Sequence, residues 1–229
     1  MIVVILAGGF GKRLQKVVND RPKPMAEING KPFLEIILDF LQKQEIKRVI
    51  ICVGYKKEII MNYFDSSYKT IKIDYSIEEI PLGTGGALIN ANSLINDENF
   101  VLINGDTYFE INLKEFFNFH LEKKSDITIA LKKVKFSNRY GSVVVDNDLR
   151  VIDFKEKITR KNTLINAGYY VIKKESIKNI KKRKFSWEEF LSCNYKKLKI
   201  YGFISDSFFI DIGIPEDYYK ANDYFKNTF

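Results

Sequence analysis

The stretch that decides the fold spans residues 2–25 and reads IVVILAGGFGKRLQKVVNDRPKPM. It opens with Ile2–Leu6, an apolar and largely β-branched run that predicts a strand buried on both faces. Three glycines follow within four positions. Because glycine has no Cβ atom, the backbone there can bend sharply and bring its N–H groups against a phosphate. Arg13 and Lys23 add positive charge close by. The stretch therefore predicts a strand and turn that bind phosphate groups.

Two familiar glycine loops do not match this turn. The P-loop places Lys-Ser or Lys-Thr directly after its last glycine, whereas Lys12 is followed by Arg13. The dinucleotide-binding fingerprint has a further glycine three positions after its second one. Here Gly9 and Gly11 form the spaced pair, but the third position is Leu14. The turn therefore belongs to another kind of phosphate-binding loop.

Length and composition predict one soluble domain. The chain has 229 residues, of which 45% are hydrophobic, and this is enough for one sizeable core. No segment resembles a signal peptide, and no apolar run approaches the roughly 20 residues that span a bilayer. Two scattered cysteines, Cys52 and Cys193, are too few for a disulfide framework or a zinc site. We therefore expect a cytoplasmic protein with no membrane partner.

The net charge of +8 arises from 37 basic and 29 acidic side chains. A nucleic-acid-binding protein would concentrate its lysines along one element. The densest cluster here, Lys178–Lys184, is short and is predicted to be a solvated surface. The excess charge can attract anionic nucleotides and sugar phosphates, and no nucleic acid is expected as a partner.

Apolar spacing predicts strands alternating with helices in the first half of the chain and mostly strands in the second. Helices are predicted over residues 34–43, 57–64, 85–94 and 113–123 and from Pro215 onward, with Thr84 as an N-cap. Strands are predicted over residues 48–53, 71–77, 100–103, 126–134, 141–145, 151–155, 166–172, 200–205 and 208–210. This is the pattern of an α/β fold with a mixed, mainly parallel central sheet, flanking helices and a smaller β-rich part. The single histidine, His120, is expected to be structural.

The chain resembles the sugar-1-phosphate nucleotidyltransferases, also called nucleoside-diphosphate-sugar pyrophosphorylases. The resemblance begins with Leu6–Leu14, which fits Leu-Ala-Gly-Gly-x-Gly-x-Arg-Leu, and Pro22–Met25. It continues in the later segments 78–87, 104–106, 140–141, 156–157, 166–168 and 211–218. Lys12 and Ile214 depart from the family pattern. The resemblance implies a Rossmann-like nucleotide-diphospho-sugar transferase fold, with residues 1–112 as the nucleotide-binding half and residues 113–229 as the sugar-phosphate-binding half.

The resemblance also implies a reaction. An oxygen of a sugar 1-phosphate attacks the α-phosphorus of a nucleoside triphosphate in line, and pyrophosphate leaves. Because the nucleophile is already an anion, positioning and electrostatic stabilisation should dominate. Lys23 is expected to stabilise the α-phosphate and Arg13 the β- and γ-phosphates. Lys12 faces either phosphate or solvent. The residues expected to bind the nucleotide are Leu6, Ala7, Gly8, Gly9, Gly11, Lys12, Glu78, Pro81, Gly83 and Thr84.

The later segments imply contacts to the sugar phosphate and to a metal ion. Asp106 and Asp211 each end an apolar run, so both are expected at strand ends. Mg²⁺ usually takes one or two carboxylates and completes its octahedron with phosphate oxygens and water. The two aspartates therefore predict a Mg²⁺ site, although either one could instead serve a turn. The residues expected to bind the sugar phosphate are Asn104, Gly141, Glu156, Lys157 and Asn166.

One residue bears on the choice of base. Relatives that use uridine or thymidine triphosphates commonly carry Gln at the position of Glu78. A carboxylate only accepts hydrogen bonds, and it can take two parallel ones, which suits the N1–H and 2-amino donors of guanine. We therefore expect GTP as the nucleotide. Whether Glu78 or Glu79 faces the base stays open at this point.

The chain is most similar to short guanylyltransferases that act on D-glycero-D-manno-heptose 1-phosphate in bacterial surface-polysaccharide synthesis, so this sugar is the leading expectation. Mannose 1-phosphate as the acceptor, or uridylyl or thymidylyl transfer to another sugar, is the alternative. A nucleotide-sugar sensor without catalysis is the alternative from another class, and the presence of Arg13, Lys23 and Asp106 favours the enzyme. A homodimer is compatible with the sequence.

Overall fold

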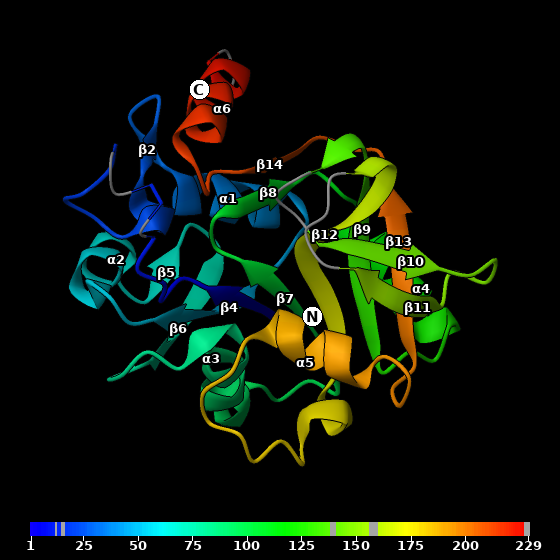
Figure 1. Ribbon diagram of the computed structural model, residues 1–229. Coiled ribbons are helices and arrows are strands. Elements are labelled where there is room, and N and C mark those ends of the chain that lie inside the picture. Colours follow the sequence, from blue (N-terminus) through cyan, green and yellow to red (C-terminus); the bar gives the residue numbers. More distant parts are fainter. Residues whose placement is uncertain (12, 15–16, 138–140, 156–159, 227–229) are drawn as a thin grey trace.

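The structure is a computed structural model that describes residues 1–11, 13–14, 17–137, 141–155 and 160–226 (Figure 1). In this part of the chain, ten strands form the main sheet, in the order β11-β10-β12-β7-β1-β4-β6-β5, with β9 paired to β12 and β13 paired to β9. These strands are β1 (Val3–Leu6), β4 (Arg48–Val53), β5 (Ser67–Tyr68), β6 (Ile71–Ile77), β7 (Asn99–Asn104), β9 (Ile127–Ser137), β10 (Ser142–Val145), β11 (Val151–Lys155), β12 (Arg160–Lys173) and β13 (Ile200–Ser205).

Helices cover both faces of this sheet (Figure 1). They are α1 (Phe33–Lys43), α2 (Lys57–Phe64), α3 (Gly83–Ala91), α4 (Leu113–Glu122), α5 (Trp187–Asn194) and α6 (Pro215–Phe225). Two small ribbons accompany them, one of β2 (Glu27–Ile28) with β3 (Lys31–Pro32) and one of β8 (Thr107–Phe109) with β14 (Phe209–Asp211). Short 3₁₀ turns are η1 (Lys23–Met25), η2 (Asn92–Leu94) and η3 (Lys174–Ile177).

The centre of the sheet is parallel, and the side toward β11 is mostly antiparallel. β1 pairs in parallel with β4 and with β7, and Leu6 lies between Cys52 and Asn104 in that register. The residues that follow these three strands therefore meet at one edge, where parallel sheets bind ligands. The antiparallel pairing of β12 with β7 extends the same sheet into the second half of the chain. The predicted mixed sheet is confirmed.

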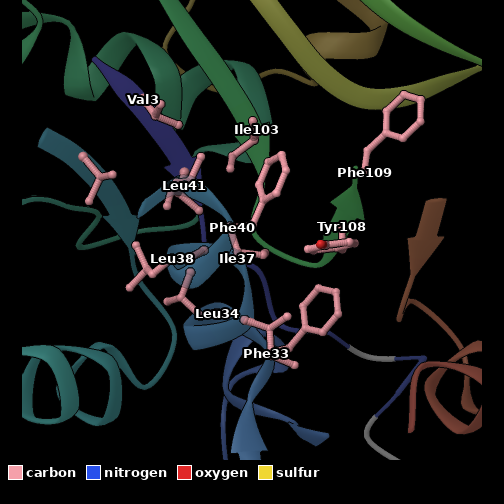
Figure 2. Packing of buried hydrophobic residues seen from close by; sticks show 14 of the residues in the cluster. Val3, Phe33, Leu34, Ile37, Leu38, Phe40, Leu41, Ile103, Tyr108 and Phe109 are labelled. Carbon is pink, nitrogen blue, oxygen red and sulfur yellow. The ribbon is translucent and has the colours of Figure 1, made fainter. Parts of the chain in front are cut away.

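β1 contributes side chains to the hydrophobic clusters on both faces of the sheet. Val3 and Ile5 belong to a cluster with α1, α2, α4 and α6, whereas Val4 belongs to the cluster on the other face with α3 and α5. Figure 2 shows the α1 side chains of this first cluster, such as Leu41, packed toward the strands that carry Val3 and Ile103. Each fully buried aliphatic side chain stabilises the fold by about 1.5–3 kcal/mol relative to exposure. The sequence run that predicts a doubly buried strand thus anchors the sheet.

Several predicted elements have the predicted bounds, including β4, α2, β6, β11 and β13. The prediction for Thr84 is wrong, because α3 begins at Gly83 with Leu82 as its N-cap, and Thr84 lies inside the helix. α3 also ends at Ala91 and is followed by the 3₁₀ turn Asn92–Leu94. The sequence analysis did not predict α5 or β8.

One surface expectation has a direct structural counterpart. The basic side chains at positions 178 and 181–184 are exposed, as predicted for a solvated cluster. No helix in the described part of the chain combines the length and the apolar character needed to cross a bilayer.

Candidate active site

A cavity of about 1060 Å³ lies at the carboxyl-end edge of the parallel strands. The predicted site residues come from widely separated segments, and every one that the structure describes lines this cavity. These are Leu6, Ala7, Gly8, Gly9, Gly11, Arg13, Lys23, Glu78, Pro81, Gly83, Thr84, Asn104, Asp106, Gly141, Asn166 and Asp211. Lys12, Glu156 and Lys157, together with Tyr140 of the segment quoted above, lie outside the described residues.

The glycine turn after β1 is tightly packed at two positions. A Cβ atom on Gly8 would lie 2.7 Å from the Glu78 carboxylate, and one on Gly11 would lie 2.8 Å from Cβ of Lys23. Gly11 also has a φ of +60°, which disfavours other residues. The Ala7 N–H donates to the carbonyl oxygen of Cys52 at 2.9 Å, which ties the turn to the end of β4. The turn thus presents a fixed run of main chain to the cavity.

Lys23 is the buried cation of the site. It lies in the 3₁₀ turn η1 between two prolines, which restrict the backbone there. Its side chain is only 11% exposed. The ammonium group forms a salt bridge with Asp106 and lies 3.7 Å from Oδ1 of Asp211. Burial opposes the charge on Asp106, yet the charge and hydrogen bond of Lys23 hold the pKa of that carboxyl below its usual value. Asp106 is therefore ionised at neutral pH.

Two aspartates far apart in the sequence are joined by the β8–β14 ribbon. β14 pairs antiparallel with β8, which places Asp211 opposite Thr107. The Ile212 N–H donates to the carbonyl oxygen of Asp106 at 3.0 Å, and the Gly213 N–H donates to Oδ1 of Asp211 at 2.5 Å. Both carboxylates therefore face one small region next to Lys23. A pair of carboxylates open to a cavity is an oxygen donor set that fits Mg²⁺.

The described residues add no larger cluster of metal ligands to this pair. Among the described residues, no group of three or more His, Cys, Asp or Glu side chains is placed to hold a metal ion. An ion at Asp106 and Asp211 would have to complete its coordination with substrate oxygens and water, which is the usual arrangement for Mg²⁺ in nucleotide sites.

The structure separates the two neighbouring glutamates. Glu78 lines the cavity, and its Oε2 accepts a hydrogen bond from the Leu82 N–H at 3.0 Å. Burial raises the pKa of the Glu78 carboxyl, and that hydrogen bond lowers it. Glu79 is 79% exposed and pairs with Lys57 at 3.0 Å. Of the two acids left open by the sequence, Glu78 is the one that faces the cavity.

The glycines of segment 83–86 allow α3 to pack against the segment 183–185 that precedes α5. A Cβ atom would lie 2.6 Å from the carbonyl oxygen of Phe185 at Gly83, and 2.3 Å from that of Arg183 at Gly86. The Thr84 hydroxyl accepts from the Trp187 N–H at 2.8 Å. It also lies 3.1 Å from Oε2 of Glu188, to which it donates. The hydroxyl predicted to cap α3 is thus used to hold α5, which is why the N-cap prediction fails.

We expect Gly86→Ala to lower the free energy of unfolding by about 1–2 kcal/mol. Alanine favours a helix by about 1 kcal/mol. A Cβ atom 2.3 Å from the backbone carbonyl oxygen of Arg183 places the overpacking cost in the upper part of the usual range, at about 2–3 kcal/mol. Chemical denaturation measures the change. Gly9→Ala is the control, because nothing lies within 4 Å of a Cβ atom there. Equal stability of Gly86→Ala and the wild type would mean that segment 183–185 is not packed against α3.

Two asparagines, Asn104 and Asn166, give another part of the cavity a polar lining. The Asn166 side-chain amide donates to the Tyr170 hydroxyl at 2.8 Å, and its Oδ1 accepts from the Gly168 N–H at 3.0 Å. A Cβ atom on Gly168 would lie 2.5 Å from Nδ2 of Asn104, and Gly168 has a φ of +73°. Asn104 and Asn166 are thus brought side by side by a bend in β12, beside Gly141. The Asn166 amide is held in one orientation by its two hydrogen bonds, and such an amide suits the hydroxyls of a sugar.

α5 adds a wall to this cavity that was not predicted from the sequence. α5 lies between α3 and the β10–β11 hairpin (Figure 1). A readable signal precedes this helix, because Ser186 is its N-cap and accepts from the N–H of Glu189, the residue arrangement of a capping box. The polar lining residues that this helix and its N-cap add are Ser186, Glu188, Glu189 and Ser192.

Three reactive side chains lie outside the proposed chemistry. The His120 ring contacts Thr128 Oγ1 at 2.9 Å and Asn99 Oδ1 at 3.1 Å, and burial lowers its pKa to about 4. These contacts suit the structural role expected for it. Cys52 is buried, which raises the pKa of its thiol, and Cys193 is exposed; both are free.

A glycine turn, two cations and two aspartates at the ligand-binding edge of an α/β sheet define an enzyme that acts on the phosphates of a nucleotide. The comparison with known families identifies the group of enzymes. Residues 2–228 match the family described as nucleotidyl transferase, and the chain belongs to that family.

Two relatives match nearly the whole chain. They are the D-glycero-alpha-D-manno-heptose 1-phosphate guanylyltransferases of Campylobacter jejuni and Aneurinibacillus thermoaerophilus, each 49% identical to this chain. The matches cover 96% of this chain and 97% and 96%, respectively, of the relatives. The predicted family is confirmed.

A solved structure matches with similar coverage. HddC from Yersinia pseudotuberculosis superposes with a TM-score of 0.87 at 41% identity, over 98% of this chain and 99% of that one. Its complex with GMP-PN gives a TM-score of 0.86, with the same identity and coverage. The predicted fold is confirmed.

Proposed function

We propose that this chain transfers GMP from GTP to D-glycero-D-manno-heptose 1-phosphate and releases pyrophosphate. The observation that carries the proposal is the single cavity that gathers Lys23, Arg13, Asp106, Asp211 and Glu78 from five parts of the sequence. The 49% identity with two heptose 1-phosphate guanylyltransferases supports the choice of sugar and base. A structural relative complexed with GMP-PN supports the guanine nucleotide.

In the proposed reaction, an oxygen of the sugar phosphate forms a bond to the α-phosphorus while the bond to the bridging oxygen of pyrophosphate breaks. The attacking oxygen is already ionised, so no residue has to remove a proton. Lys23 stabilises the charge that grows on the α-phosphate, and Arg13 binds the leaving pyrophosphate. The amides of the glycine turn hold the triphosphate chain. Asp106 and Asp211 would hold Mg²⁺, which would neutralise charge between the two anionic substrates.

Glu78 is proposed to recognise the base. Its carboxylate is fixed by the Leu82 N–H and faces the cavity beside Gly8. Two parallel hydrogen bonds from the N1–H and 2-amino groups of guanine would satisfy it. Uracil and thymine would place a carbonyl lone pair against the charge. A mismatch of this kind is worth about 1–3 kcal/mol of discrimination.

We expect Glu78→Gln to erode the preference for GTP over UTP or dTTP. A loss of about 1–3 kcal/mol corresponds to roughly 5- to 150-fold in the ratio of kcat/KM values. The matched control is Glu79→Gln, which removes the same charge from the exposed neighbour that pairs with Lys57. Steady-state kinetics with each nucleotide measures the ratio, and an unchanged ratio in Glu78→Gln would show that the base is read by other groups.

The sugar phosphate is proposed to occupy the end of the cavity that carries Asn104, Asn166 and Gly141. Glu156 and Lys157 are proposed to complete this subsite, with the glutamate accepting from sugar hydroxyls and the lysine binding the phosphate. The proposed place of action is the cytoplasm, in keeping with two free cysteine thiols.

The experiment that tests the function is pyrophosphate release across five nucleotides, each combined with several sugar 1-phosphates, with and without Mg²⁺. We expect release with GTP and the heptose 1-phosphate, dependent on Mg²⁺. Release with mannose 1-phosphate alone would identify mannose 1-phosphate as the acceptor in place of the heptose 1-phosphate. Release with UTP or dTTP in place of GTP would show that the proposed base is wrong. Tight nucleotide-sugar binding without release from any pair would identify a sensor and reject the enzyme.

A further inference from the structure

The last helix of the chain is bound to the hairpin that follows Lys23. Figure 1 shows α6 beside the β2 hairpin, and α6 itself follows Asp211. The Tyr218 hydroxyl donates to the carbonyl oxygen of Glu27 at 2.7 Å. The Asn29 N–H donates to Oδ1 of Asn222 at 2.9 Å, and the Asn29 side-chain amide donates to the carbonyl oxygen of Asn222 at 2.8 Å. Segments about 190 residues apart are thereby joined by three hydrogen bonds.

The hairpin and the helix each hold the contacting groups in one geometry. Asn29 and Gly30 have φ values of +50° and +82°, the geometry of an Asn-Gly hairpin turn. This turn directs both amide donors of Asn29 outward from the hairpin. On the helix, the side-chain amide of Asn222 donates to the carbonyl oxygen of Tyr218 at 3.0 Å, so its own acceptor is held in one orientation. The contact is therefore specific in geometry and goes beyond a general packing of two surfaces.

The two joined segments carry the ion pair at the centre of the site. Lys23 lies just before the hairpin, and Asp211 lies just before the helix. Between them the space is tight, because a Cβ atom on Gly213 would lie 3.2 Å from Nζ of Lys23. A shift of α6 relative to the hairpin would therefore change the position of the Asp211 carboxylate relative to the Lys23 ammonium group.

We propose that Asn29, Tyr218 and Asn222, the α6 clamp, are positioning residues that fix Lys23 relative to Asp211. The clamp residues do not line the cavity, so they act through these two groups. The proposal rests on the proposed function, since it assigns Lys23 to phosphate binding and Asp211 to metal binding. Misplacing a reacting group by about 1 Å can cost about 10²-fold in rate, so partial loss of the clamp should be visible in kcat.

The test compares Tyr218→Phe and Asn222→Ala with the wild type. Tyr218→Phe removes one hydroxyl and should lower kcat several-fold; Asn222→Ala removes the side-chain acceptor and should lower it about tenfold. KM for GTP should change less than twofold in both variants. Asn222→Asp keeps an acceptor for the Asn29 N–H and should recover part of the loss. The matched control is Tyr224→Phe, because that hydroxyl on the same helix contacts Glu110 at 3.4 Å and leaves the clamp intact.

A second measurement does not depend on turnover. Binding of Mn²⁺ to the chain, followed by electron paramagnetic resonance, should weaken in Asn222→Ala and stay unchanged in Tyr224→Phe. Unchanged kcat and Mn²⁺ affinity in Asn222→Ala would overturn the proposal. So would an equal loss in Tyr224→Phe, which would point to general weakening of the helix. If the wild type used another nucleotide or sugar phosphate, the proposed substrates would be wrong, and the same ratios measured with that pair would still decide the clamp.

Discussion

Replacing Lys23 by alanine is expected to lower kcat by on the order of 10²–10³ while the chain stays folded. Removing one preorganised group that stabilises transition-state charge typically has an effect of this size. Lys23 is suited to this role because its side chain is only 11% exposed and is held in the cavity by the flanking prolines and two aspartates. In such a site its charge is screened less by water than that of a surface lysine.

The control for this experiment is Lys57→Ala. Lys57 also forms a salt bridge with a carboxylate, but its partner is the exposed Glu79, and the pair lies outside the cavity lining. Single-turnover rates with saturating GTP and sugar phosphate, together with circular dichroism, separate loss of chemistry from loss of fold. A Lys23→Ala rate near that of Lys57→Ala would remove Lys23 from the mechanism.

Much of the fold could be predicted because its information is local. Runs such as Arg48–Val53 and Ile71–Ile77 carry the apolar or alternating pattern of a strand within their own sequence, and both strands have the predicted bounds. β8 could not be found in this way, because three residues carry too little pattern and the strand exists through its pairing with β14, about 100 residues later. α5 was missed although Ser186 and Glu189 give a readable helix start.

The site was predicted from the order of its motifs, and its internal contacts were not. Gly8, Glu78 and Asp106 come just after the parallel strands β1, β6 and β7, so the sheet gathers them at one edge. That rule does not reveal that Lys23 pairs with both Asp106 and Asp211, since the pairing depends on the β8–β14 ribbon. It also does not reveal that the Thr84 hydroxyl binds the Trp187 N–H of α5. A threonine before an apolar stripe resembles an N-cap in sequence even when the fold uses its hydroxyl for another contact.

Asp106→Asn is expected to lower kcat/KM by on the order of 10²–10³ and to raise the Mg²⁺ concentration for half-maximal activity at least about tenfold. Asparagine keeps the shape of the side chain and removes its charge. The loss should be large because Asp106 is ionised at neutral pH, its pKa being held low by Lys23 in spite of burial. The substitution therefore removes a full negative charge from the proposed metal site.

The matched control is Asp148→Asn. Asp148 lies in the β10–β11 turn, outside the cavity lining, and its carboxylate forms an ion pair with Lys123. Mg²⁺ titrations of pyrophosphate release, repeated with Mn²⁺, measure both variants. Asp211→Asn should shift the titration in the same direction as Asp106→Asn, because the β8–β14 ribbon holds the two carboxylates beside one another. An unchanged titration in Asp106→Asn would show that the metal ion binds away from Asp106 and Asp211. The role of the two aspartates would then be to hold the Lys23 ammonium group in place.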